Sequence, residues 1–308
     1  MNIGHVTLDL SIYDPAQDIY SDGPVEDEML AIAQEDREAD ALANDNRWPI
    51  LYHFSPLRHN LLSWYPFHEG ASLLEVGSGC GAMTGVFLDQ GLNVRCIESS
   101  KRRATIAAHR HQAHDLAITI GDVLRGPAEA SYDYLTLIGV LEYAPMFLPQ
   151  AEHPFHDMLR HMRQFLRPGG TLVIAIENRL GMKYFTGAGE DHTSKPYEGL
   201  IGYPHTTHAA TFSHSELAAL LRSAGFSHLD WYYPYPDYKL PEQIYSDAFL
   251  PAPENLVADI CAYDADRIMT FDERAAMQTV AGKDEFRMLA NSFLVFCRKE
   301  DAPHDRED

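Results

Sequence analysis

The sequence lacks the features of an exported, membrane-spanning or nucleic-acid-binding protein. No stretch approaches the roughly 20 uncharged apolar residues that a membrane helix needs. The amino terminus, MNIGHVTLDLSIYDP, lacks the basic start and apolar run of a secretion signal. Positive charge is scarce, since 24 Lys and Arg stand against 45 Asp and Glu and the net charge is −21. Because such a chain repels a phosphate backbone, we expect a cytoplasmic protein without a membrane span or a nucleic-acid partner.

Cysteine is also scarce, and its spacing disfavours a disulfide framework or a zinc site. The four cysteines, Cys80, Cys96, Cys261 and Cys297, form no C-x-x-C pair. Cys96 and Cys297 lie in apolar strand-like runs, which is typical of buried thiols. One positively biased stretch, residues 101–114, could line a basic groove, but a solvated helix face is the favoured interpretation.

The chain divides into an acidic beginning and a long alternating region. Residues 1–47 are acidic with few aromatics, and residues 26–45 could form one amphipathic helix. Such a run is more often a solvated arm or a mobile lid than part of a core. Residues 48–67 are dense in aromatics and predict a short helix packed against the body. From residue 72, apolar strands alternate with helices, which is typical of a parallel sheet covered on both faces.

This alternation predicts one α/β domain over residues 48–308, preceded by an acidic arm. The expected strands are residues 72–77, 93–98, 116–122, 132–139, 171–178, 227–236 and 291–299. Two stretches do not fit the alternation, and we expect them to be cap insertions above one edge of the sheet, after the fifth and sixth strands. They are residues 178–212 and 235–290.

A glycine-rich turn follows the first expected strand. In LLEVGSGCG, residues 73–81, three glycines allow a tight turn and a close approach of the backbone to a ligand. Taken alone the pattern is ambiguous, because G-x-G-x-x-A with Glu98 about 20 residues later also satisfies a dinucleotide fingerprint. A nucleotide-type ligand is favoured here over a purely structural turn.

Further polar residues stand at the ends of the expected strands. Glu75 lies two residues before the first glycine, and Glu98 ends the second strand, where a carboxylate can accept hydrogen bonds from both ribose hydroxyls. Asp122 follows the third strand, and LRPGG at residues 166–170 forms a turn into the fifth. These motifs, in this order, resemble those of the class I S-adenosylmethionine-dependent methyltransferases. The resemblance covers residues 72 to about 177 and extends through the last two expected strands.

The resemblance implies a Rossmann-like, mostly parallel sheet of seven strands whose last strand is inserted antiparallel. It also implies S-adenosyl-L-methionine as cofactor, with the glycine loop at its methionine part, Glu98 at its ribose and Asp122 at its adenine. Arg58 could pair with the carboxylate of the cofactor, although an exposed helix position is equally compatible. The expected cofactor-binding residues are Arg58, Glu75, Gly77, Ser78, Gly79, Gly81, Glu98, Ser99, Asp122, Val123 and Gly139.

The segments after the fourth and fifth strands are expected to face the methyl acceptor. Glu142 and Tyr143 lie in LIGVLEYAP, where this family places residues between cofactor and acceptor. The turn GAGEDHT at residues 187–193 overhangs the pocket, because ligands bind at the carboxyl ends of parallel strands. Loops with glycines and many polar groups above a rigid sheet are more often functional than connective.

Proton transfer is the favoured role of the GAGEDHT turn. Its two acidic residues disfavour a phosphate site, and no H-x-x-x-H spacing supports a metal site, so no metal is expected. An oxygen nucleophile is poor while it is protonated, and a base beside it helps. His192, with an ordinary pKa of roughly 6.5, is the expected base, and Asp191 and Glu142 are further candidates. A turn capped by Asp191 with a surface histidine is the open alternative.

A narrower resemblance concerns the acceptor. Residues 52–67, 73–85, 137–145, 176–193 and 232–251 are together similar to bacterial methyltransferases encoded beside glycosyltransferases and assigned to surface-polysaccharide synthesis. This resemblance implies a saccharide acceptor and an oxygen nucleophile. The expected acceptor-binding residues are Tyr143, Asn178, Tyr184, Tyr203, Tyr235, Asp237 and Lys239.

Three rival functions stay open. The aromatic stretch WYYPYPDYKLP at residues 231–241 would equally suit a small-molecule O- or N-methyltransferase of specialised metabolism, or could simply pack the insertion. A non-catalytic subunit that binds the cofactor and docks on a partner enzyme through its acidic arm is a second rival. An NAD-dependent oxidoreductase is disfavoured by the turns at Asp122 and at residues 166–170. A homodimer is compatible with all of these functions.

Overall fold

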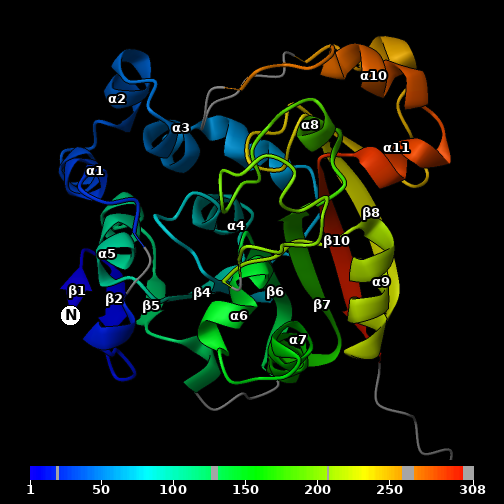
Figure 1. Cartoon of the computed structure of the whole chain (residues 1–308). Coiled ribbons are helices and arrows are strands. Elements are labelled where there is room, and N and C mark those ends of the chain that lie inside the picture. Colours follow the sequence, from blue (N-terminus) through cyan, green and yellow to red (C-terminus); the bar gives the residue numbers. More distant parts are fainter. Residues whose placement is uncertain (19–20, 126–130, 207, 259–266, 301–308) are drawn as a thin grey trace, which may run out of the picture.

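One mixed β-sheet organises the computed structural model, which describes residues 1–18, 21–125, 131–206, 208–258 and 267–300 (Figure 1). Its strand order is β1-β2-β5-β4-β3-β6-β7-β10-β8-β9. The strands are β1 (Asn2–Ile3), β2 (Val6–Asp9), β3 (Ser72–Val76), β4 (Asn93–Glu98), β5 (Leu116–Ile120), β6 (Tyr132–Ile138), β7 (Leu166–Glu177), β8 (Phe226–Tyr235), β9 (Gln243–Ser246) and β10 (Ser292–Lys299).

The pairing confirms a Rossmann-like α/β fold with an inserted antiparallel last strand. Strands β2, β5, β4, β3, β6 and β7 pair in parallel, whereas β10 pairs antiparallel with both β7 and β8. The sheet has ten strands rather than the expected seven, because β1 and β2 extend one edge and β9 extends the other. The expected turn at residues 166–170 is instead an irregular start of β7, where the register with β6 shifts between Tyr132 and Tyr134.

Helices cover both faces of the sheet and bury two apolar clusters. On one face lie α7 (Pro154–Phe165) and α9 (His214–Ser223), and on the other lie α4 (Thr84–Asp89) and α5 (Lys101–Arg110). The start of α9 is specified locally: Ser213 accepts a hydrogen bond from the Glu216 backbone, and the Glu216 carboxylate accepts one from the Ser213 backbone. The central strands are buried on both faces, which explains their nearly continuous apolar sequence.

The acidic segment at the amino terminus packs into the fold rather than forming a solvated arm. Strand β2 pairs with β5, and α1 (Val25–Gln34) packs on α5 (Figure 1). The single helix expected over residues 26–45 is two helices, α1 and α2 (Glu38–Asn44), and Asp36 between them has a positive φ of 53°. The aromatic stretch that follows also divides, into α3 (Trp48–Phe54) and a 3-10 helix, η2 (Pro56–Leu61).

A buried ion pair joins the amino-terminal segment to the sheet domain. Arg103 of α5 donates from Nε to Glu26 of α1 at 2.8 Å, and its Nη2 lies 2.7 Å from Asp22. Glu26 is 1% exposed and Arg103 is 6% exposed. One residue earlier, Arg102 pairs with Asp27 on the surface, where the arginine side chain is 44% exposed. The same two helices therefore share one buried and one exposed ion pair.

The described parts of the two expected insertions contain short elements. They are α8 (Met182–Phe185), β9, the 3-10 helix η5 (Pro253–Asn255), α10 (Glu273–Val280) and α11 (Asp284–Leu289), and Figure 1 shows α8, α10 and α11 at the same end of the sheet. Cys80, Cys96 and Cys297 are buried free thiols, whereas Cys261 lies outside the described residues. Among the helices that the structure describes, none has the length and apolar character needed to cross a membrane.

The paired arginines of α5 allow a matched stability test. Replacing Arg103 by Met leaves Glu26 buried without its counter-charge, so we expect Arg103→Met to lower the free energy of unfolding by about 3–5 kcal/mol. Arg102→Met, which removes an exposed pair, should change it by at most about 1 kcal/mol. Urea denaturation followed by circular dichroism measures both. Equal losses would show that the buried pair does not hold the amino-terminal segment in place.

Candidate active site

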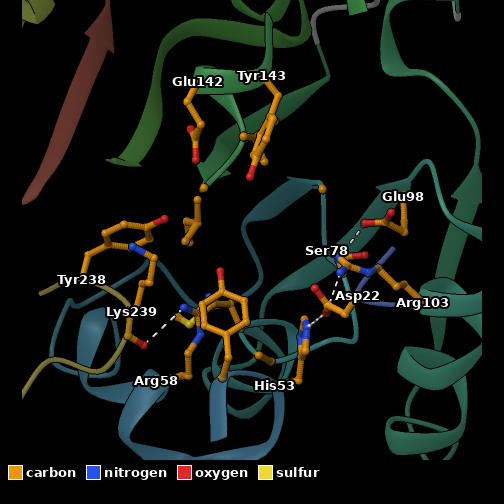
Figure 2. Close-up of a pocket in the computed structure, with 18 of the residues that line it drawn as sticks. Asp22, His53, Arg58, Ser78, Glu98, Arg103, Glu142, Tyr143, Tyr238 and Lys239 are labelled. Atoms are coloured by element: carbon orange, nitrogen blue, oxygen red, sulfur yellow. Dashed lines mark hydrogen bonds and ion pairs between the residues drawn. The ribbon is translucent and has the colours of Figure 1, made fainter. Parts of the chain in front are cut away.

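A cavity of about 300 Å³ opens at the carboxyl ends of the parallel strands. Figure 2 shows Glu142 and Tyr143 across it from His53 and Arg58, with Glu98 on a third side and Tyr238 and Lys239 on a fourth. Thirteen of the expected site residues line this cavity. They are Arg58, Glu75, Gly77, Ser78, Gly79, Glu98, Ser99, Gly139, Glu142, Tyr143, Asp191, His192 and Lys239.

The loop after β3 is shaped for close approach of a ligand. Gly77 and Gly79 have φ angles of 70° and 54°, in the left-handed region that favours glycine. A Cβ on Gly77 would meet a methyl carbon of Val140 at 2.6 Å. The Gly79 backbone donates to Glu98 at 2.7 Å, which holds this carboxylate against the loop. The hydroxyl of Ser78 is buried and has no partner among the described residues, so it is available to a ligand.

Glu75 lies at the base of this loop and is fully enclosed. Its carboxylate accepts a hydrogen bond from the Thr84 hydroxyl at 2.6 Å. Burial raises the pKa of Glu75 to about 7, although the hydrogen bond from Thr84 opposes the shift. The strand thus presents a carboxyl group that is partly protonated near neutral pH.

A wall of the pocket comes from the amino-terminal segment, which the sequence did not implicate. Asp22 contacts His53 at 2.9 Å and Arg103 at 2.7 Å. Burial, reinforced by the nearby arginine charges, lowers the pKa of His53 to about 4 although Asp22 opposes the shift, so His53 is neutral. Asp22 is one acid among many in an acidic stretch, and no local pattern distinguishes it. Only its packing against His53 and Arg103 brings it to the cavity.

Arg58 is buried rather than exposed on a helix. Its guanidinium lies 4.1 Å from the centre of the Tyr52 ring and donates through Nη1 to the Lys239 backbone carbonyl at 3.2 Å. Its Nε has no hydrogen-bond partner among the described residues. A buried guanidinium with a free donor is suited to an anionic group of a ligand.

The turn at residues 187–193 places His192 in the pocket and supplies its orienting partner. Nδ1 of His192 lies 2.8 Å from Glu190, and the His192 backbone donates to the same carboxylate at 2.9 Å. On its other side, Nε2 lies 3.8 Å from Glu142, and the ring packs edge-on against Tyr143. Burial disfavours the charged imidazole, but Glu142 and Glu190 outweigh it and raise the pKa of His192 well above its ordinary value.

Asp191 contacts two lysine side chains, whereas the neighbouring His192 contacts two glutamates. Its carboxylate contacts Lys183 at 2.9 Å and Lys239 at 2.7 Å, and it accepts a hydrogen bond from Tyr184. Although burial opposes it, the two ammonium groups hold the pKa of Asp191 well below its usual range. Asp191 is therefore a poor proton acceptor, and its contacts position Lys239.

Glu142, Glu177 and His192 form a cluster at the inner end of the pocket. Each can direct one donor atom so that the three atoms lie within 4.8 Å of one another. One oxygen of Glu142 and one oxygen of Glu177 are buried without a hydrogen-bond partner among the described residues. The other oxygen of Glu177 contacts Lys239 and Tyr238. Glu177 is the last residue of β7, and no pattern in the sequence associates it with Glu142.

Eight expected site residues do not line the cavity that the structure describes. They are Gly81, Asp122, Val123, Asn178, Tyr184, Tyr203, Tyr235 and Asp237. Asp122 caps the backbone of Leu124, and a Cβ on Gly81 would meet the ring of His111 at 2.8 Å, so Gly81 serves helix packing. Asn178 is fully buried and donates to two backbone carbonyls near β10.

Of the other five, Val123 is buried in an apolar cluster, and four lie around the pocket rather than in it. Tyr184 bonds Asp191, and Asp237 pairs with Lys183 at 2.7 Å. Tyr203 donates to Glu190 at 3.4 Å, behind His192, and Tyr235 is buried in the apolar cluster under α9. These residues stabilise the loops that carry the lining residues, so their role in acceptor binding stays a prediction.

Comparison with known proteins identifies the family. The family model described as "Methyltransferase domain" matches residues 51–230, more than half of the chain. No curated protein matches the sequence significantly. Many solved structures match the fold at low identity.

Three of these structures illustrate the level of similarity. A methyltransferase in complex with the Trm112 activator from Haloferax volcanii is 19% identical, with a TM-score of 0.49 over 89% of this chain and 98% of that chain. A SAM-dependent methyltransferase from Thermotoga maritima is 17% identical, with a TM-score of 0.46 over 87% and 100%. One from Archaeoglobus fulgidus is 11% identical, with a TM-score of 0.49 over 79% and 93%. Similarity at this level carries no inference about the acceptor or a partner.

The buried Glu75 predicts a pH-dependent stability. Because its folded pKa of about 7 exceeds its ordinary value of 4.5, its contribution is fully present below pH 4.5 and is lost as pH rises through 7. We therefore compare the free energies of unfolding of Glu75→Gln and the wild type without added cofactor. The value for the variant relative to the wild type should rise by roughly 3 kcal/mol between pH 4.5 and pH 8. Urea denaturation at several pH values measures this difference.

Glu216→Gln is the matched control for this titration. Arg179 lowers the pKa of Glu216 to about 2, so the stabilising contribution of Glu216 is lost only as pH falls below 4.5. The free energy of unfolding of Glu216→Gln relative to the wild type should stay constant between pH 5 and pH 8. A constant difference for Glu75→Gln over the same range would contradict the raised pKa.

Proposed function

The chain belongs to the methyltransferase-domain family and is an S-adenosylmethionine-dependent methyltransferase, and from this premise we propose that it methylates a hydroxyl oxygen of a small polyhydroxylated acceptor such as a saccharide. The observation that carries the proposal is the cluster of Glu142, Glu177 and His192. In this proposal, residues 178–212 and 235–290 are caps that place acceptor-binding side chains over the sheet.

The cofactor end of the pocket fits the methyl donor. When bound, S-adenosylmethionine supplies an electrophilic methyl group on a sulfonium. We infer that the loop from Gly77 to Gly79 accommodates its amino-acid part, because these residues line the cavity and the Ser78 hydroxyl has no partner among the described residues. The Arg58 donor without a partner suits its carboxylate, and Glu98, fixed by the Gly79 backbone, suits its ribose hydroxyls.

At the opposite end of the pocket, two buried carboxylate oxygens have no hydrogen-bond donor among the described residues. Glu142 and Glu177 are each 1% exposed, and each leaves one oxygen without a partner among the described residues. An unsatisfied buried carboxylate is costly, and the hydroxyl groups of a polyol would satisfy both oxygens at once. Tyr143, whose ring packs against His192, and Tyr238, whose hydroxyl donates to Glu177, offer flat surfaces to a sugar ring.

The same cluster is placed to promote loss of the acceptor proton. A neutral hydroxyl is a poor nucleophile, and stabilising the oxygen as its proton leaves accelerates the transfer. His192 was expected to act as the base, but its raised pKa keeps the imidazole protonated near neutral pH, so in this proposal it stabilises the developing negative charge on the oxygen. Glu190 fixes the orientation of the imidazole, so that Nε2 lies on the side of Glu142.

An amine is the second candidate acceptor. Two buried carboxylates with free oxygens would also hold an ammonium group, and the surrounding aromatic faces favour cations. Radiolabelled methyl transfer to a panel of monosaccharides, sugar nucleotides, phenols and primary amines separates the classes. Turnover of saccharides alone supports the proposal, whereas turnover of amines alone replaces it.

His192 and His205 provide a matched pair for testing the cluster. Both receive a carboxylate at Nδ1, from Glu190 and Glu198 respectively, but His205 is largely exposed and outside the cavity. We expect His192→Gln to lower kcat by about 10²–10⁴-fold with an unchanged Kd for S-adenosylmethionine. His205→Gln should leave both values within about twofold. Normal turnover by the His192 variant would exclude the cluster from the reaction.

The cofactor end is tested separately. Glu98→Ala removes the carboxylate that the glycine loop holds, so we expect at least a tenfold weaker binding of S-adenosylmethionine by isothermal titration. Glu142→Gln, at the other end, should bind the cofactor like the wild type. If both variants lose affinity equally, the pocket does not divide into cofactor and acceptor ends as proposed.

A further inference from the structure

The inner end of the pocket has the composition of a metal site. We propose that Glu142, Glu177 and His192 bind one divalent metal cation. The three residues come from separate segments: the 3-10 helix η4 (Leu141–Tyr143), the end of β7, and the turn at residues 187–193. Their donor atoms lie within 4.8 Å of one another. Ligands at the coordination distance of roughly 2.0–2.2 Å lie about 3–3.5 Å apart, so the three side chains would move toward one another on binding a divalent ion.

The unpartnered oxygens point to a ligand rather than to a solvated acidic patch. Glu142 and Glu177 are both 99% buried, and each has one oxygen without a hydrogen-bond partner among the described residues. Buried polar atoms in proteins are nearly always satisfied, and an exception calls for an ion, a water or a ligand. One cation between the two carboxylates would satisfy both oxygens.

His192 is held as metal-binding histidines are held. Its Nδ1 is engaged by Glu190 at 2.8 Å, and Glu190 is itself fixed by the backbone and hydroxyl of Thr193. A carboxylate on one imidazole nitrogen orients the ring and increases the basicity of the other nitrogen toward a metal. The other nitrogen, Nε2, lies on the side of Glu142.

The side chains around the cluster carry more negative than positive charge, which favours binding of a cation. Five buried or half-buried carboxylates form a connected network with two lysines, Lys183 and Lys239. The carboxylates are Glu142, Glu177, Glu190, Asp191 and Asp237. Among these described side chains, the five carboxylates exceed the two lysines by three negative charges, and a divalent cation reduces this excess to one. Lys239 and Tyr238 contact one oxygen of Glu177, which leaves the other oxygen of this carboxylate for a cation.

The donor set selects the kind of ion. Two carboxylate oxygens and one imidazole nitrogen suit Mn²⁺, Fe²⁺ or Zn²⁺ better than ions that require all-oxygen or thiolate ligands. Three protein ligands leave coordination positions open to the pocket, as in catalytic metal sites. The next step rests on the proposed function: we infer that acceptor oxygens occupy these open coordination positions. The cation then promotes release of the hydroxyl proton to water. Acceptors with two adjacent oxygens are then preferred.

Binding of Mn²⁺ to the full chain tests the site without relying on turnover. Titration of metal-free protein with Mn²⁺, followed by electron paramagnetic resonance of the free ion, should give one site per chain. We expect Glu177→Gln and Glu142→Gln to weaken this site at least tenfold, and Glu190→Gln, which acts through His192, to weaken it by about 10–100-fold. Glu198→Gln alters a carboxylate–histidine pair outside the pocket and should leave it unchanged.

The outcomes separate the metal site from the proposed reaction. Absence of Mn²⁺ binding, or binding that Glu177→Gln and Glu142→Gln leave intact, overturns the site. Cofactor affinity and circular dichroism show that each variant is folded. If methyl transfer persists in a chelator and no Mn²⁺ binds, the metal site is wrong and the proposed function stands. If Mn²⁺ binds as expected but no hydroxyl is methylated, the site stands and the proposed acceptor is wrong.

Discussion

The concentration of buried carboxylates at one edge of the sheet is the constraint on which the site depends. Parallel strands direct their carboxyl ends to the same edge, and here β3, β4 and β7 each carry a glutamate at or near that end. Each charge must be neutralised, paired or given a hydrogen-bond donor. Glu75 responds with a raised pKa, Glu98 accepts two backbone hydrogen bonds, and Glu177 contacts Lys239. Carboxylate oxygens that lack such a partner are available to bind ligands.

This constraint divides the pocket into two chemically different ends. At the end that we propose binds the cofactor, the carboxylate of Glu98 is held by backbone donors, and Nε of Arg58 has no hydrogen-bond partner among the described residues. At the end that we propose binds the acceptor, negative charge exceeds positive charge among the described residues, and two oxygens have no partner there. A sulfonium or a metal cation reduces the excess of charge, and a hydroxyl group donates a hydrogen bond to an oxygen that lacks one. The acidic character of the chain therefore acts locally at the site and not only on the surface.

The ion pairs of the amino-terminal segment contribute both to the stability of the fold and to the wall of the pocket. Glu26 and Asp22 reach the sheet domain through Arg103, and Asp22 continues to His53 at the pocket wall. The ion pair that attaches α1 is thus continuous with the lining of the cofactor end. Removal of residues 1–47 would uncover β5 and the buried arginine together, which explains why this acidic stretch is packed instead of solvated.

The strand–helix alternation, the glycine loop and the cofactor could be predicted from the sequence, because these signals are local. Apolar periodicity and glycine spacing depend on neighbours within one element, and Glu98 follows its strand at a recognisable distance. The extension of the sheet by β1, β2 and β9 and the approach of Glu177 to Glu142 required the three-dimensional structure. These contacts join segments whose relative positions are set by packing, and no pattern within either segment encodes the other. The contact of Glu190 with His192 lies within one turn, and it depends on the conformation that this turn adopts.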